Sequence, residues 1–135
     1  MLLLLSRAPE PVDLEFIHAI DFIATYGKAF SITDQNVNGD NNFMFGERPA
    51  RFRRDEEALR ELVLEGYVKP VASEKGLLYC LTARGVECSS TLDSDYARSY
   101  VAACERAIAE SEQKSLEEIV REIHRLEKRT LRKGL

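Results

Sequence analysis

Residues 65–85 read EGYVKPVASEKGLLYCLTARG, and this stretch decides the fold. Two apolar runs flank a turn at residues 73–76, which is the pattern of a β-hairpin with Gly76 in the turn. Pro70 cannot donate a ladder hydrogen bond, so its strand is expected at a sheet edge. Thr82 follows the second strand and is suited to cap a helix. The side chains expected to close over a helical core are Val68, Val71, Leu78 and Cys80.

Two helices are expected before this hairpin. Asp13 can cap the first, whose apolar residues recur every three or four positions from Leu14 to Ala24. Gly27 suits the left-handed position after its end. The second helix is expected to begin at Pro49 and to stop at Gly66.

Three further helices are expected after the hairpin. The Thr82-capped helix runs to about Leu92, and Asp93 or Ser94 can cap the next one. Ser115-Leu116-Glu117-Glu118 fits a capping box before the last helix. The apolar opening at residues 1–5 is read as a short buried strand or a segment that docks on a partner.

The expected elements follow the order of a winged helix, namely helix, loop, helix, hairpin and Thr-capped helix. The expected fold is therefore mainly α with a small β-hairpin, a winged helix-turn-helix domain followed by a C-terminal helical extension. The domain, with an N-terminal docking segment, would span residues 1–92, and the helices at 93–135 would serve packing or partner binding.

The charge balance limits the partners. The chain has 135 residues, and its 19 Lys and Arg against 23 Asp and Glu give a net charge of −4. Residues 93–135 hold nine acidic and nine basic residues, so the whole deficit lies in residues 1–92. A polybasic nucleic-acid coat is excluded, and DNA contact would need a local patch.

Cysteine usage and hydropathy indicate the compartment. Three cysteines without paired spacing argue against a disulfide scaffold and fit a reducing cytoplasm. No run approaches the roughly 18 apolar residues that a membrane span needs. We therefore expect a cytoplasmic protein without membrane contact.

No catalytic motif is present in the sequence. It contains no Gly-rich phosphate loop, no nucleophile elbow and no His and Cys at ligand spacing, so we expect neither an enzyme nor a cofactor. His18 is interpreted as a surface or half-buried packing residue. Asp34 to Asn42 partly match a calcium loop, but Phe45 stands where a bidentate Glu is needed. A loop held by its own Asx side chains is the preferred interpretation.

Two sets of residues could form contacts with other macromolecules. The basic set could meet DNA or an acidic partner, or could simply be solvated; it comprises Arg48, Arg51, Arg53, Arg54, Lys75, Lys128, Arg129 and Arg132. The apolar set could form a partner interface, although for its helical seam packing on the preceding helix is the preferred interpretation. It comprises Leu2, Leu3, Leu4, Leu5, Phe43, Phe45, Leu116, Ile119, Ile123 and Leu126.

The combination of three stretches resembles a known family. They are residues 2–13 together with 18–27, the Asn-rich loop at 36–43 and the hairpin at 76–85. Together they look like the small middle component of prokaryotic ABC-three-component systems, which include the Lamassu group of anti-phage and anti-plasmid defences. The resemblance implies a non-catalytic accessory subunit with no catalytic residues to carry over. It would link an SMC/Rad50-like ATPase subunit to an effector, often a nuclease.

A second interpretation remains open from the residues alone. A dimeric winged-helix DNA-binding transcription regulator would pair through its C-terminal helices. It would touch DNA with Arg51, Arg53, Arg54 and Lys75. Against this, the same helix carries Asp55 and four glutamates, which repel phosphates.

Overall fold

The computed structural model describes residues 1–41 and 43–133, with side chains up to residue 130. These residues form a mainly helical fold with one two-stranded antiparallel hairpin, as predicted. The elements are α1 (Leu2–Arg7), α2 (Leu14–Thr25), α3 (Met44–Leu64), β1 (Val68–Ser73), β2 (Gly76–Leu81), α4 (Ala83–Ser90), α5 (Asp95–Ser111) and α6 (Leu116–Lys133).

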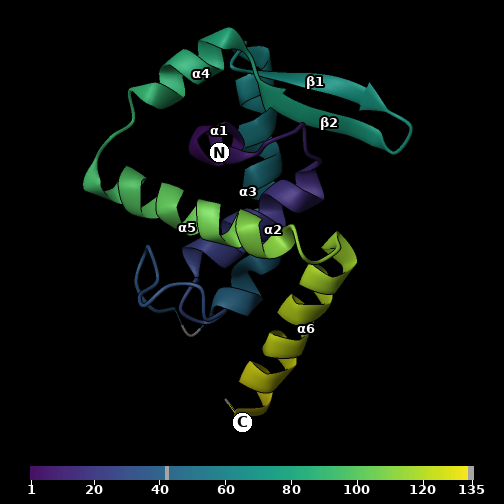
Figure 1. The fold of residues 1–135 in the computed structure, drawn as a ribbon. Helices are drawn as coiled ribbons and strands as arrows, with labels where there is room; N and C mark the ends of the chain where they lie inside the picture. Colours follow the sequence, from purple (N-terminus) through teal and green to yellow (C-terminus); the bar gives the residue numbers. More distant parts are fainter. Residues whose placement is uncertain (42, 134–135) are drawn as a thin grey trace.

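The apolar N-terminal run forms helix α1, so the prediction of a short buried strand was wrong. Leu5 N–H donates to the carbonyl of Met1, which closes the first turn. Leu4 and Leu5 are buried within this chain. Figure 1 shows α1 in the middle of the upper half of the molecule, where it contacts α2, α4, α5 and β2. A run this short carries no period that separates a buried helix from a buried strand.

The helix predicted after Asp13 is α2. The Asp13 carboxylate accepts from the N–H of Phe16 at 2.8 Å, which is the expected cap. Gly27, however, does not adopt the predicted left-handed conformation, which belongs to Gly39, Gly66 and Gly76. A side chain at Gly27 would clash with Thr33, so this glycine is required for the close return of the following loop.

Helix α3 begins at Met44, five residues before the predicted start at Pro49. Met44 and Phe45 are buried in a cluster of aromatic side chains, and this packing extends the helix backwards. Pro49 therefore lies inside the helix. Gly66 ends the helix region with φ +85°, as predicted.

The hairpin pairs Val68 with Leu81 and Ser73 with Gly76. Both backbone groups of Tyr79 bond to Val12, so Val12 forms an isolated β-bridge beside β2, on the side away from β1. Tyr79 turns these groups away from β1, which makes Pro70↔Tyr79 a non-hydrogen-bonded pair. The nitrogen of Pro70 therefore faces the open edge, where its missing N–H costs no ladder bond.

Only part of the predicted hairpin face reaches the core. Val68, Tyr79 and Leu81 contact it, because they lie on the same side of the pleat. Val71, Leu78 and Cys80 lie on the opposite side and are only half-buried. Their predicted place over the core was therefore wrong.

Side-chain caps fix the starts of the three C-terminal helices. The side-chain oxygens of Thr82, Ser94 and Ser115 accept from the backbone N–H three residues ahead, as expected for N-caps. A side chain at Gly85 would overlap the Tyr67 carbonyl, so α4 lies directly against the start of the hairpin.

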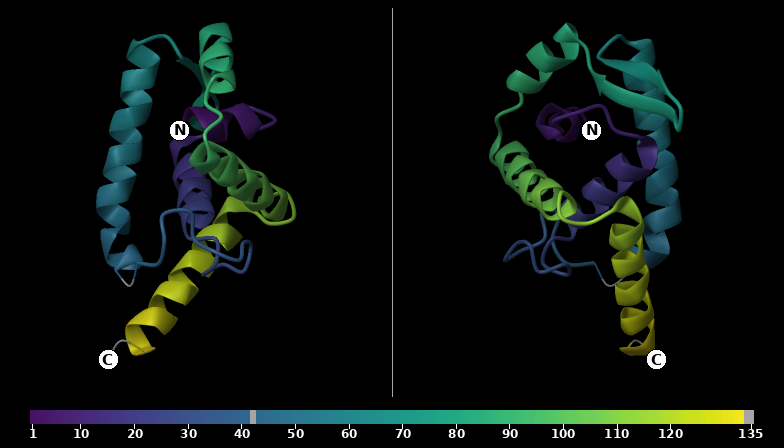
Figure 2. Two further views of the ribbon diagram at one scale, coloured as in Figure 1. Left: turned by 90° about the vertical axis from the view of Figure 1, so that its left-hand side faces the viewer. Right: turned by 45° about the vertical axis from the view of Figure 1, so that its right-hand side comes forward.

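Two apolar clusters hold the elements together. The first includes buried residues of α1, α2 and α5, among them Leu4, Ile20 and Cys104. Helix α5 therefore belongs to the main core. The second cluster joins α2 and the start of α3 to α6 through Phe22, Phe45, Ile119, Ile123 and their neighbours. Figure 2 shows α6 leaving this body with its C-terminal end pointing away.

Candidate functional site

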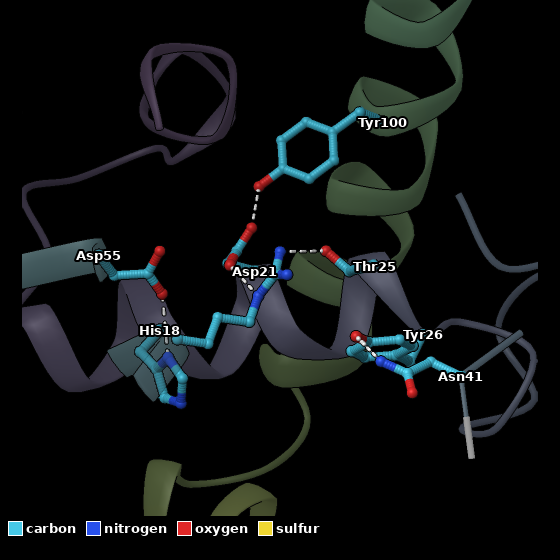
Figure 3. A network of polar contacts seen from close by, with 8 residues as sticks. His18, Asp21, Thr25, Tyr26, Asn41, Asp55 and Tyr100 are labelled. Carbon is cyan, nitrogen blue, oxygen red and sulfur yellow. Dashed lines mark hydrogen bonds and ion pairs between the residues drawn. The ribbon is translucent and has the colours of Figure 1, made fainter. Parts of the chain in front are cut away.

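A stripe of polar side chains lies on one face of α2. His18, Asp21 and Thr25 are spaced by three and four residues, so they share the same side of the helix. All three are at least nine-tenths buried. Figure 3 shows them reaching side chains from α3 and α5.

Asp21 joins three helices. Its Oδ1 accepts from the Tyr100 hydroxyl of α5 at 2.6 Å, and its Oδ2 pairs with Arg51 Nε of α3 at 2.9 Å. Arg51 Nη2 donates to Thr25 Oγ1 at 2.8 Å, and its guanidinium lies 5.9 Å from the ring centre of Tyr26. Burial, the largest single influence, lowers the pKa of Arg51, but the charge and hydrogen bond of Asp21 together with the charge of Asp55 outweigh it, so the net pKa is raised.

His18 and Asp55 form the second pair of this network. With Asp55 ionised, His18 Nδ1 donates to its Oδ2 at 2.9 Å, and His18 Nε2 is a buried atom without a hydrogen-bond partner. The His18 ring meets Phe52 edge-on, with 4.9 Å between centres. Burial raises the pKa of Asp55, although the His18 bond and the Arg51 charge oppose the shift. His18 is therefore buried and paired, unlike the predicted surface or half-buried position.

This network is a structural clamp rather than an open pocket. Its acids, bases and hydroxyls bond to one another across α2, α3 and α5, with only His18 Nε2 left without a partner. Burial, reinforced by the nearby Asp21 charge, raises the pKa of Tyr100 far above its ordinary value, so the hydroxyl stays protonated as a donor. Across residues 1–41 and 43–133, no group of three His, Cys, Asp or Glu side chains gathers closely enough to hold a metal ion.

The basic residues singled out in the sequence do not form one patch. Arg53 and Arg54 are exposed on α3, Lys75 is exposed at the hairpin turn, and Lys128 and Arg129 are exposed on α6. Arg48 is half-buried, and Arg51 is occupied by Asp21 and Thr25. Arg132 lies beyond the side chains that the structure describes.

Most of the apolar residues predicted for a partner interface pack inside the chain. Leu4, Leu5, Phe45, Ile119 and Ile123 are buried. Leu2, Leu3, Leu116 and Leu126 are half-buried against the two clusters. Phe43 alone among this set is exposed, at 75%. The seam of α6 packs on α2 and the start of α3 rather than on the preceding helix.

The loop after α2 is held by its own polar side chains. Asn36 Oδ1 accepts from the N–H of Lys28, and Asn36 Nδ2 donates to Asp40. Asn41 Nδ2 reaches both the Tyr26 hydroxyl and Glu47, while its Oδ1 accepts from the N–H of Phe43. These bonds agree with the preferred Asx-loop interpretation; Asn42 of the calcium pattern lies outside the described residues.

Asp21 and Tyr100 were not singled out from the sequence, and Asp55 was considered only as a charge that repels phosphates. A signal for Asp21 was available, because α2 carries apolar residues on nearly every side, which indicates a buried helix whose polar side chains need partners. Tyr100 lies 79 residues from Asp21, and no local pattern connects them.

None of the described helices has both the length and the apolar composition needed to cross a lipid bilayer.

Comparison with known proteins assigns the chain to a family. No curated protein and no solved structure matches it. The family model of the ABC-three component (ABC-3C) system Middle Component 2 matches residues 1–133, which is nearly the whole chain. The resemblance to a middle component is thereby confirmed. The chain belongs to the Middle Component 2 family and is an accessory middle component of an ABC-three-component system.

Proposed function

We propose that this chain is a non-catalytic adaptor built on a winged-helix scaffold. The scaffold is supported by the order of the elements: α1, the β-bridge at Val12, α2, α3 and the hairpin follow the helix, strand, helix, helix, hairpin order of winged helices, with the bridge in the place of the first strand. Asp21, Arg51 and Tyr100 bond to one another in the interior, and His18 bonds to Asp55, which supports a structural role for these groups. Function would then lie in the surfaces that the scaffold presents.

In this proposal the adaptor joins an SMC/Rad50-like ATPase subunit to an effector, such as a nuclease, in a cytoplasmic anti-phage or anti-plasmid defence complex of the Lamassu type. The observation that carries the proposal is the family match across residues 1–133. Three cysteines that are all free suit a reducing cytoplasm. The exposed acidic residues of α3 favour protein contact over DNA contact.

Co-expression with the products of the neighbouring genes tests this role. We expect the affinity-tagged chain to purify as a stable complex with an ATPase subunit and an effector subunit. The complex should hydrolyse ATP and act on nucleic acid, while the isolated chain does neither. A chain that purifies without either neighbour, or that turns over a substrate alone, contradicts the proposal.

DNA binding is the second candidate, and the exposure of Arg53 and Arg54 on α3 favours it. A dimeric regulator would place these residues and Lys75 against phosphates. A mobility-shift assay with the chain's own promoter should then show binding that falls steeply with salt and is weakened by Arg53→Ala with Arg54→Ala. Promoter binding that is not weakened by these two substitutions contradicts the role of a regulator.

A further inference from the structure

A groove lies between the loop that follows α2 and helix α6. It has a volume of about 360 Å³, and its lining includes Phe30, Ser31, Arg125, Leu126 and Arg129. A second hollow of about 240 Å³ begins on the other side of Ser31, toward the end of α5. In Figure 2 the loop lies close to the corner between α5 and α6.

The groove has an apolar floor and a basic wall. Phe30 and Leu126 are half-buried and belong to the edge of the second apolar cluster. Arg125 and Arg129 are one helical turn apart and exposed, so both can face one ligand. Within the described part of the chain, neither of them makes an ion pair or a side-chain hydrogen bond.

The acidic residue beside this wall is already neutralised. Glu122 lines the groove, but it pairs with Lys114 Nζ at 3.0 Å. The hydrogen bond to Glu122 raises the pKa of Lys114, which is the expected effect of a carboxylate partner. The charge of the two arginines is therefore left for something outside the chain.

The positive charge of this wall contrasts with the negative net charge of the whole chain. Residues 121–133 hold six basic and two acidic residues in a chain whose net charge is −4. The phosphate backbone of a nucleic acid would contact only the basic wall and would leave the apolar floor uncovered. An occupant that also covers Phe30 and Leu126 must carry apolar groups.

We propose that this groove binds an acidic peptide segment that places an apolar side chain over Phe30 and Leu126 and its carboxylates against Arg125 and Arg129. The source of the segment rests on the proposed adaptor function: it is a stretch of another subunit of the same system. The binding itself is measured on this chain alone.

The probe is a short fluorescein-labelled peptide in which Asp and Glu alternate with Phe and Leu, read by fluorescence anisotropy. We expect the variant Arg125→Glu with Arg129→Glu to bind it about tenfold more weakly or worse, because two attractive contacts become repulsive. The matched control is Arg53→Glu with Arg54→Glu, which changes the net charge equally on exposed α3 and should bind like the unmodified chain.

A variant on the other wall guards against loss of the α6 helix. Ala29 is exposed and lines the groove from the loop, so Ala29→Glu adds a repulsive charge without touching α6. It should weaken binding of the same peptide. Thermal melting of each variant separates weaker binding from unfolding.

Four results would overturn the inference. The first three are equal weakening by the α3 and α6 variants, no binding tighter than that of the α6 variant, and preferential binding of a labelled DNA duplex that the α6 variant loses. The fourth is equal binding of a peptide in which Ser replaces Phe and Leu, which should bind more weakly. If the peptide binds but no neighbouring subunit co-purifies, the groove stands and the adaptor role falls. If the α6 variant co-purifies as well as the unmodified chain, the adaptor role stands and the assignment of the segment to another subunit falls.

Discussion

The α2 clamp and helix α6 use arginine in opposite ways. Arg51 is enclosed by Asp21, Thr25 and Tyr26 and holds α2 against α3. Arg125 and Arg129 stand on an exposed helix beside a groove and have no acidic partner among the described residues. An arginine that is paired and enclosed therefore stabilises the fold, whereas arginines that are exposed and unpaired are free to bind a partner.

The largest effect should come from breaking the clamp with Asp21→Ala. The change leaves the Arg51 guanidinium and the Tyr100 hydroxyl without their buried acceptor. We expect a loss of about 3 kcal/mol in the free energy of unfolding, measured by urea denaturation. Asp93→Ala on the surface is the control and should change stability by less than about 0.5 kcal/mol. Equal effects of the two would mean that the clamp contributes nothing.

Ile123→Ala should loosen α6 while leaving the clamp in place. Ile123 is 1% exposed in the cluster that attaches α6 to α2 and α3. Removing its side chain should cost about 2–3 kcal/mol. Hydrogen exchange should therefore accelerate mainly in α6 and little in α5. Thr130→Ala, on the exposed part of α6, is the control. Uniform acceleration across both helices would show that α6 and the clamp unfold as one unit.

The pair of Asp55 and His18 should make the stability of the clamp depend on pH. Because burial raises the pKa of Asp55 in the folded state, the folded chain binds that proton more tightly than the unfolded chain. Asp55 therefore contributes its whole stabilisation at pH values below the ordinary Asp pKa. This contribution is lost as the pH rises through the raised pKa of Asp55 in the folded chain. The stability of the unmodified chain relative to Asp55→Asn should therefore decline between pH 4 and pH 7. A constant difference in urea midpoints across this range would contradict the shift.

The smallest effect concerns thiol reactivity. Burial, with the Tyr100 bond opposing it, raises the pKa of Cys104 to about 12, and the thiol is fully enclosed. Cys80 and Cys88 are half-buried. A thiol reagent at pH 8 should label these two in the native chain and reach Cys104 only after denaturation. Mass spectrometry of the labelled chain checks this; native labelling of Cys104 would show that the α2–α5 interface opens readily.

Local signals in the sequence predicted the elements better than their contacts. Asp13, Thr82, Ser94 and Ser115 identify helix starts, because a cap depends on residues three positions apart. The start of α3 was missed, since burial of Met44 and Phe45 by distant residues outweighs the signal of Pro49. The clamp could not be predicted, because its partners come from three helices. The groove could not be predicted either, because it exists only where α6 meets the loop.

Pro70 at the open edge of β1 affects how copies of this protein associate at high concentration. A strand that approaches this edge from another molecule finds no amide proton at Pro70, the third residue of β1. Extension of the sheet from one copy to the next is therefore disfavoured along this edge. Contacts through side chains, which differ from one protein to another, are favoured over contacts through the backbone, which all proteins share.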